Sequence, residues 1–256
     1  MTSLSNPDLE ILAERLAAAQ AESSLILPPA AAQTPRDVAE AYRVQQRVLA
    51  LRAEAVAGWK VGARSPRDEP HAAPLPASGV VTAPAQLPHA LAPTFGLELE
   101  LTFRLDRRFE PRPAPYTEAE VLDSIGSVMA AIELVSSRQP NWPGSSPLIQ
   151  LADLQNHLAL VVGDAVPYDR GAFFESLPLL FEYEGHCIAS GPCRNPAGDP
   201  RRLLPWLVNH ACAQGQAIGP EQVLTTGSYT GLYFPETAGH ALAEIEGLPP
   251  VSLRLV

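Results

Sequence analysis

The sequence predicts an α+β protein whose N-terminal part is mainly helical and whose remainder is rich in strands. Two stretches within residues 1–57 repeat apolar residues at helical spacing, and both precede any strand pattern. From residue 58 to residue 256, short apolar or alternating runs lie between Pro- and Gly-containing segments, which is typical of strands and turns. No internal repeat and no break in composition divides the chain, so we expect a single domain over residues 1–256.

Each of the two N-terminal helices has a start signal. The first is expected to run from a capping Ser5 or Asn6 to about Glu22, with Pro in its first turn. The second is expected to run from a capping Thr34 to about Ala55, again with Pro at the first helical position. Two helices therefore precede the first strand.

Residues 96–103 alternate leucine with acid and are the most informative stretch of the chain. If they form a strand, its leucines cover a core while Glu98 and Glu100 share the other face. At about 3.3 Å per residue, the two carboxylates lie about 6.6 Å apart along the strand, close enough to reach one divalent cation. The alternative is an ordinary half-buried strand with glutamates on its wet side.

Two further charges lie inside apolar, strand-prone runs. Glu133 is the lone charge in residues 131–135 and must face water, pair with a cation or bind a metal, because an unpaired buried charge costs several kcal/mol. Lys60, within residues 58–62, is either a surface lysine or the cation near the glutamates. Three carboxylates would form an all-oxygen site suited to Mg²⁺ or Mn²⁺, with Lys60 offsetting their charge and gripping a substrate carboxylate.

The remaining elements are expected from shorter patterns. We expect helices from Thr117 through Met129, where a capping box opens the run, and over residues 148–160 and 201–216. We expect strands at residues 131–135, 159–163, 179–183, 186–189, 222–226 and 251–255, with a hairpin tip at Glu184 and Gly185. Residues 64–93 are rich in Pro, Ala and His and predict a mobile or lid segment, with at most a short strand at 79–82.

Composition excludes several classes of partner. A net charge of −10 disfavours nucleic acids and anionic membranes, and a small anionic substrate would need a local positive centre. The N-terminus lacks the features of a signal peptide and no run is long enough to span a bilayer, so we expect a cytoplasmic protein. Cys187, Cys193 and Cys212 form no C-x-x-C, which predicts reduced and buried thiols.

Common catalytic motifs are missing, which leaves the carboxylates as the chemical candidates. The sequence has no G-x-G-x-x-G, P-loop, H-E-x-x-H or G-x-S-x-G pattern. Its histidines show no ligand spacing and are interpreted as surface or satisfied residues: His71, His89, His157, His186, His210 and His240.

In order and spacing, several pieces together resemble the fumarylacetoacetate hydrolase superfamily and, within it, the 2-oxopent-4-enoate (2-keto-4-pentenoate) hydratase branch. The pieces are Tyr42-x-x-Gln45, Gly58-Trp59-Lys60-Val61-Gly62, Glu98-x-Glu100, Ala131-Ile132-Glu133 with Ser137-Arg138, Ala152-Asp153 ten residues before Gly163, and Gly227-Ser228-x-Thr230-Gly231. The resemblance covers essentially the whole chain.

This resemblance implies a mixed β-sheet roll flanked by helices, with the catalytic part in residues 58–256. It implies that Glu98, Glu100 and Glu133 hold Mg²⁺ or Mn²⁺, and that Lys60 contacts the substrate or assists proton transfer. The residues expected to bind substrate are Ser228, Thr230, Gly231, Arg138 and Asp153. Asp153 could equally be a helix cap or a structural carboxylate. The resemblance also suggests a homo-oligomer, which could associate with the decarboxylase of the same pathway.

The activity implied is hydration of a short 2-hydroxy-2,4-dienoate to a 4-hydroxy-2-oxo acid in aromatic catabolism. The nearest rival is the decarboxylase of a 2-oxohex-3-enedioate, which Arg64, Arg67 or Arg138 would favour if one faced the pocket as a carboxylate clamp. A C–C hydrolase of acylpyruvates is a third candidate. Residues 64–80 do not align with the family's acidic residue, so a non-catalytic binding protein or inactive partner subunit also stays open.

Overall fold

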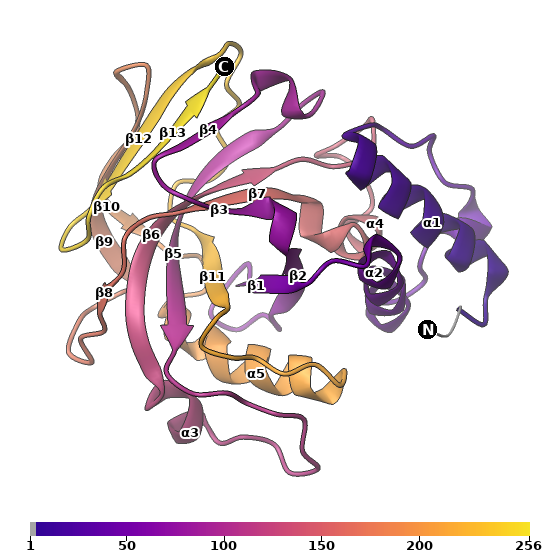
Figure 1. The fold of residues 1–256 in the computed structure, drawn as a ribbon, viewed down its shortest axis with the longest axis horizontal. Coiled ribbons are helices and arrows are strands. Elements are labelled where there is room, and N and C mark those ends of the chain that lie inside the picture. The colour runs from indigo at the N-terminus through magenta and orange to yellow at the C-terminus, as the bar shows by residue number, and fades with distance from the viewer. Residues whose placement is uncertain (1–3) are drawn as a thin grey trace.

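A computed structural model describes residues 4–256 as an α+β protein built on two mixed sheets (Figure 1). The helices are α1 (Pro7–Glu22), α2 (Val38–Arg52), α3 (Glu118–Leu122), α4 (Pro147–Ala152) and α5 (Leu203–Ala213). The strands are β1 (Val56–Gly62), β2 (His71–Pro76), β3 (Val80–Thr82), β4 (Ala85–Leu87), β5 (Gly96–Leu105), β6 (Ile125–Val135), β7 (His157–Val162), β8 (Val166–Pro167), β9 (Ser176–Tyr183), β10 (His186–Arg194), β11 (Val223–Ser228), β12 (Gly239–Ile245) and β13 (Val251–Leu255).

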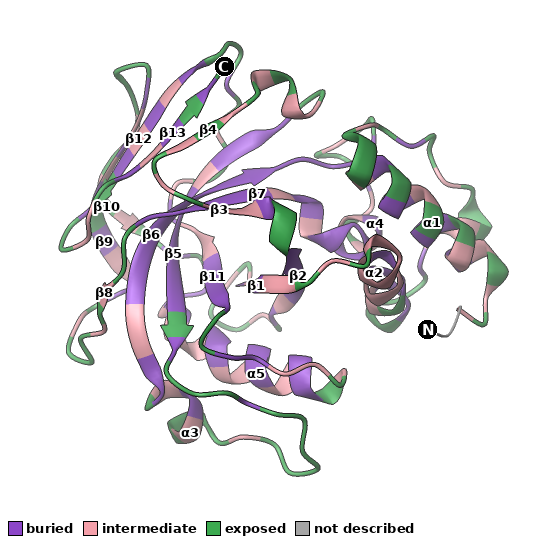
Figure 2. Cartoon of the chain, in the orientation of Figure 1, coloured by how far each residue is buried: buried purple, intermediate pink, exposed green. Residues whose placement is uncertain are grey.

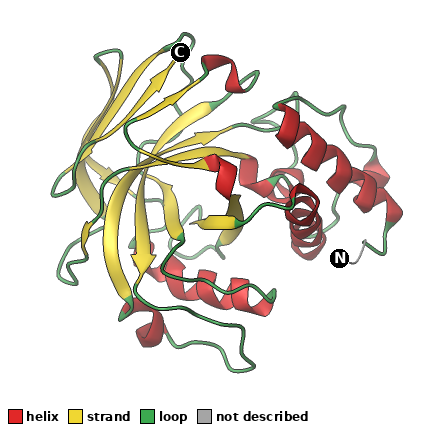
Figure 3. Cartoon of the chain, in the orientation of Figure 1, coloured by secondary structure: helices red, strands yellow, loops and turns green. Residues whose placement is uncertain are grey.

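The larger sheet has the strand order β2-β1-β11-β5-β6-β7-β3, with β8 also paired to β6. It is mixed, because β1 runs parallel to β11 and β3 parallel to β7, while the other neighbours are antiparallel. The second sheet has the order β10-β9-β12-β13-β4. The larger sheet curls, and both sheets contribute to one hydrophobic core, so the predicted β-sheet roll flanked by helices is confirmed (Figure 3).

A separate hydrophobic cluster joins α1, α2 and α4, and Ala73 of β2 packs into it. The Asn6 side chain accepts a hydrogen bond from the Asp8 backbone N–H, as expected for the first helix. The second helix begins later than expected, at Val38, because the Asp37 carboxylate caps the Glu40 N–H. The prediction of Thr34 as its cap was therefore wrong.

The helix expected from Thr117 through Met129 is mostly wrong. Thr117 and Glu120 do form the capping box, but α3 ends at Leu122. The following residues form β6, whose long pairing with β5 buries its apolar side chains (Figure 2). The local signal set the start of the helix, and tertiary pairing overrode the helical spacing beyond it.

In residues 64–93 the short strand expected at 79–82 is confirmed as β3, but the expectation that the rest lacks regular structure is wrong, since β2 and β4 also lie there. Each of the three is an edge strand. An edge strand tolerates proline because one side of its backbone needs no ladder partner. The prolines of β2, which made it look irregular in the sequence, are therefore compatible with its place at the edge of the sheet.

Of the other local predictions, some are confirmed and some are wrong. The hairpin tip is confirmed, with positive φ of 50° at Glu184 and 74° at Gly185, while β12 was not expected at all. Cys212 is buried, but Cys187 is exposed and Cys193 is partly exposed, so burial of all three was wrong. Within residues 4–256, none of the helices combines the length and apolar character needed to cross a membrane.

Candidate metal centre and its pocket

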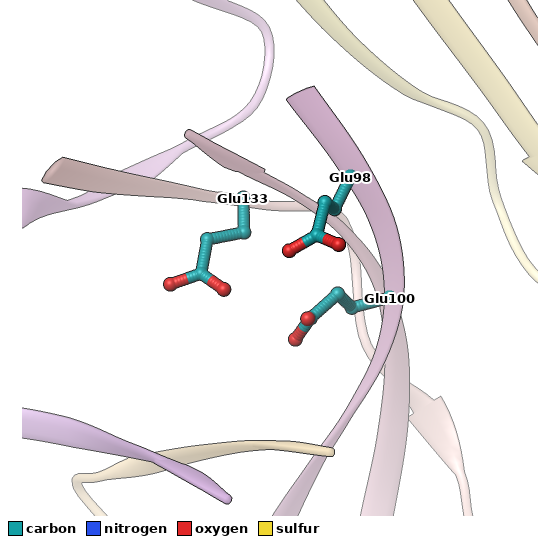
Figure 4. Close-up of side chains that lie close together, drawn as sticks. All are labelled: Glu98, Glu100 and Glu133. Atoms are coloured by element: carbon teal, nitrogen blue, oxygen red, sulfur yellow. The ribbon is translucent and has the colours of Figure 1, made fainter. Parts of the chain in front are cut away.

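The pairing of β5 with β6 brings three glutamates together. Glu98 lies directly opposite Glu133, and Glu100 lies opposite Ala131 two pairs further along. Carboxylate oxygens of the three glutamates all lie within 4.8 Å of one another, and Figure 4 shows the three side chains converging from neighbouring strands. Glu133 is 0% exposed and Glu100 is 2% exposed, so the alternative of a water-facing alternating strand is wrong.

Lys60 supplies the positive charge from β1. Its Nζ donates hydrogen bonds to Glu133 Oε1 and Oε2, both at 2.8 Å, and to the Gln155 carbonyl oxygen at 3.2 Å. Its side chain is 13% exposed, so it is not a surface lysine. Burial favours the neutral amine, but the attraction of Glu133 and then Glu100 outweighs burial and raises the Lys60 pKa.

His157 is a site residue that the sequence reasoning missed. It begins β7, beside β6, and its Nδ1 lies 3.2 Å from Glu133 Oε1. Burial lowers the His157 pKa despite the attraction of Glu133, which favours a neutral ring that donates from Nδ1. A search for metal-ligand spacing could not detect this contact, which arises from strand order.

Glu100 is held from the other side by β11. The Thr225 hydroxyl donates to Glu100 Oε2, and the Gly227 N–H donates to the same oxygen at 3.3 Å. These donors orient the carboxylate beside Glu98 and Glu133. The site therefore has supporting contacts from β1, β7 and β11.

The electrostatics of the cluster favour an added cation. Burial and then repulsion from Glu133 raise the Glu98 pKa to about 7, and burial followed by the same repulsion raises the Glu100 pKa well above its ordinary value. The Glu133 carboxyl is also buried, yet Lys60 and His157 hold its pKa below the ordinary value. Oxygen ligands, burial and two carboxylates that retain protons without a cation together fit a hard divalent ion.

A strained turn presents the Gln155 carbonyl to Lys60. The helix expected over residues 148–160 stops at Ala152, and the non-glycine residues Leu154, Gln155 and Asn156 follow with φ of 48°, 50° and 60°. Consecutive left-handed residues of this kind cost about 1–2 kcal/mol each. Such a conformation persists only where the surrounding structure fixes it.

The fixing contact is the buried pair of Arg138 and Asp153. The Arg138 Nε lies 2.8 Å from both Asp153 carboxylate oxygens, and its other nitrogens donate to the Asp153 and His157 carbonyl oxygens. Because these side chains engage each other, we assign them a structural role, one of the alternatives considered for Asp153. The expected substrate contact by Arg138 and Asp153 finds no support in this geometry.

The Ser228–Gly231 loop is fixed to β5 rather than free. Ser228 Oγ accepts hydrogen bonds from the Thr230 and Gly231 N–H groups at 3.2 and 2.9 Å, and Thr230 Oγ1 accepts from Leu99 N–H at 3.1 Å. The Ser228 hydroxyl also stabilises ionised Glu98. Ser228 thus adjoins the carboxylates, whereas Thr230 holds the loop and Gly231 lies exposed.

A cavity of about 480 Å³ opens beside the cluster. The residues lining it come from β1, β2, the loop between them, β5, α2 and the segment around α4: Val38, Lys60, Arg64, His71, Glu98, Pro147, Leu148, Gln150, Leu151, Gln155 and Asn156. Of the predicted substrate contacts, Ser228, Thr230, Gly231, Arg138 and Asp153 are not in this lining. Lys60 and Glu98 connect the cavity to the carboxylate cluster.

The fold and site define a protein with a candidate carboxylate metal centre at the wall of a curled mixed sheet. No family model matches the chain. Two curated relatives, both named 2-keto-4-pentenoate hydratase, are each 26% identical to it. The one from Paraburkholderia phymatum matches over 95% of both chains, and the one from Burkholderia vietnamiensis over 94%.

Among solved structures, 4-oxalocrotonate decarboxylase from Pseudomonas putida G7 is similar over the full length of both chains. It matches with a TM-score of 0.84 in its complex with magnesium and adipate and 0.82 with calcium and acetate, at 18% identity in each case. The chain thus shares the fold of these solved structures and resembles two 2-keto-4-pentenoate hydratases in sequence, which confirms the resemblance inferred from the motifs.

Proposed function

We propose that the protein is a divalent-metal-dependent hydratase that adds water to a short 2-hydroxy-2,4-dienoate and yields a 4-hydroxy-2-oxo acid. The observation that carries this proposal is the buried cluster of Glu98, Glu100 and Glu133 at the wall of a cavity. The full-length similarity to 2-keto-4-pentenoate hydratases supports the choice of reaction.

Glu98, Glu100 and Glu133 would hold the ion, with Mg²⁺ or Mn²⁺ favoured by the all-oxygen ligand set. When bound, such an ion supplies a Lewis acid that stabilises negative charge on the 2-oxo or enol oxygen of the acid. Lys60 keeps Glu133 ionised and oriented, and it brings positive charge to the cavity where an anionic substrate would enter. Ser228 favours ionised Glu98.

A second candidate is the decarboxylation of a 2-oxohex-3-enedioate, because Arg64 lines the cavity. Its side chain is 96% exposed and only loosely paired, with Nε 3.7 Å from Asp68 Oδ2, so its guanidinium is free to pair with a second substrate carboxylate. Arg67 is exposed outside the lining and Arg138 is buried against Asp153. Arg64 is therefore the clamp to test.

One assay separates these activities. Purified protein with Mg²⁺ is given freshly generated 2-hydroxypenta-2,4-dienoate or its six-carbon dicarboxylate analogue, and diene absorbance and carbon dioxide are both followed. Loss of the diene without carbon dioxide, abolished in Glu133→Ala, is the expected result. Carbon dioxide release from the dicarboxylate would favour the decarboxylase. No turnover of either compound would contradict both and favour an acylpyruvate hydrolase or a non-catalytic protein.

A further inference from the structure

We infer that His71 is the proton-transfer residue of the pocket, acting on the water that adds to the substrate. This inference rests on the proposed function. His71 lies in the segment that the sequence analysis expected to be irregular, and no motif pointed to it. In the structure it opens β2 and lines the same cavity as Lys60 and Glu98.

Strand register places His71 on the same face of the sheet as Lys60. In the antiparallel pair of β1 and β2, Lys60 is opposite Ala73 and Gly62 is opposite His71. Directly opposite residues share a face, so His71 is the diagonal neighbour of Lys60, at about 7–8 Å for such pairs. A short substrate held near Lys60 therefore lies within reach of the imidazole.

The space between these two side chains is open. Gly62 is the residue opposite His71, and a β-carbon built on it would meet no atom of the described residues within 4 Å. Val61 and Trp59 point the other way into the core and are 2% and 0% exposed. The strand thus presents one closed apolar face and one open face that carries Lys60 and His71.

The backbone that carries His71 is fixed by the Tyr42-x-x-Gln45 motif of α2. The Ala72 N–H donates to the Tyr42 hydroxyl at 3.1 Å, and Gln45 Nε2 donates to the Ala72 carbonyl at 3.1 Å. Gln45 also donates to the Leu151 carbonyl at 2.8 Å, which ties β2 to α4. The motif therefore positions the histidine without using its side chain.

The imidazole itself keeps hydrogen-bonding capacity for a ligand. His71 is half-buried, and neither of its ring nitrogens has a hydrogen-bond partner among residues 4–256; Nδ1 is shielded from solvent, which leaves Nε2 as the nitrogen that a water can reach. Lys60 is differently placed, since its Nζ already donates to Glu133 and to the Gln155 carbonyl. Of the two nitrogen side chains on this face, His71 is the one available to accept a proton.

The charges around His71 agree with this role. Burial lowers the His71 pKa, Glu69 opposes that effect and Arg64 adds to it, so the ring is neutral at pH 7. Burial also raises the Tyr42 pKa to about 12 and lowers the His210 pKa to about 4, so both of these neighbours are uncharged. The other ionisable groups facing the cavity are Lys60 and Glu98.

His71 would both accept and return one proton during the hydration. The dienol first ketonises: its 2-hydroxyl proton is lost to solvent, the C2=C3 and C4=C5 electrons shift, and C5 gains a proton from solvent, which gives the 2-oxo-3-enoate. As the water oxygen then bonds to C4, His71 takes one water proton and the C3=C4 electrons move through C2 to its oxygen. The enolate then re-forms the C2 carbonyl and takes the proton from the imidazolium at C3. One water is added, and His71 returns to its neutral form.

The test uses His71→Ala and His71→Gln, with His186→Ala on the exposed β9–β10 hairpin as the matched control. Each variant is measured for kcat/KM against pH, for Mg²⁺ affinity by calorimetry, and for exchange of the C3 protons of 2-oxopentanoate in D₂O by NMR. We expect kcat/KM to fall by about 10²–10⁴-fold in both variants, the range for a lost general acid–base group. The low-pH limb should disappear, Mg²⁺ affinity should hold, and added imidazole should restore part of the rate in His71→Ala.

The inference is overturned if both variants keep the wild-type pH profile with a rate loss below about tenfold, or if they lose Mg²⁺ affinity as severely as activity. If the wild type fails to hydrate any dienoate, the proposed function fails, and the exchange reaction still decides the role of His71. Exchange that requires His71 supports the inference. Exchange that is absent from the wild type, or independent of His71, overturns it.

Discussion

The wall of the pocket and its rim differ in how their charged groups are held. On the wall, formed by β5 and β6, the glutamates are oriented by strand register and by donors from three other strands. On the rim, residues 63–80, Arg64 is almost fully exposed and the His71 Nδ1 has no partner among the described residues. The difference indicates that the wall fixes a charge centre, whereas the charged and polar groups of the rim have few fixed partners.

The largest effect is expected where the wall depends on one cation. Lys60→Met leaves Glu133 buried without its main partner, and removing one member of a buried pair costs about 3–5 kcal/mol. We expect metal-free Lys60→Met to lose free energy of unfolding in this range in urea at pH 8, and to recover part of it with Mg²⁺. A loss below about 1 kcal/mol, typical of exposed pairs, would show that Lys60 does not hold the wall together.

Arg138 fixes the strained turn at residues 154–156, so its loss should lower the free energy of unfolding about as much as the loss of Lys60 from the wall. Arg138→Met leaves the Asp153 carboxylate, which is 0% exposed, without its charged partner. We therefore expect a loss of about 3–5 kcal/mol in unfolding free energy. The matched control is Arg194→Met, whose partner Glu175 is 40% exposed; there we expect less than about 1 kcal/mol. Equal losses in the two variants would contradict the structural role of Arg138.

The pH dependence of stability tests the charge of the wall directly. The Glu98 pKa of about 7 exceeds the ordinary 4.5, so its stabilising contribution is complete below pH 4.5 and is lost as pH rises through 7. A bound cation replaces the proton, so Mg²⁺ should raise Tm more at pH 8 than at pH 6. In Glu98→Gln this pH dependence should shrink. An Mg²⁺ effect that is equal at both pH values in the wild type would argue against proton retention by Glu98.

The smallest effect is expected at the rim. Arg64→Ala should leave stability and Mg²⁺ affinity unchanged, because the side chain is exposed and its ion pair is loose. If Arg64 grips a second carboxylate, KM for the six-carbon dicarboxylate should rise several-fold while KM for the five-carbon dienoate stays constant. Equal changes in KM for both substrates would show that Arg64 does not bind a second carboxylate. The main structural support for the decarboxylase would then be lost.

The same contrast explains what the sequence could predict. Alternation along residues 96–103 determines which side chains share a face, and a lone acid inside an apolar run implies a partner, so Glu98, Glu100, Glu133 and Lys60 could be found. His71 and His157 could not, because their roles depend on which strands become neighbours. The edge strand β2 was hidden by its prolines and β4 by its shortness, and the end of α3 depended on the pairing of β6 with β5.

Metal binding by the wall is the central claim, and titration of the metal-free protein with Mn²⁺ by calorimetry tests it most directly. We expect one ion per chain in the wild type and in the control Glu175→Gln. Glu175 directly precedes β9, and its side chain is 40% exposed. We expect affinity to fall by more than about 100-fold in Glu98→Gln, Glu100→Gln and Glu133→Gln, because changes to outer-shell groups alone cost about 10–100-fold. Unchanged Mn²⁺ affinity in all three folded variants would contradict the account.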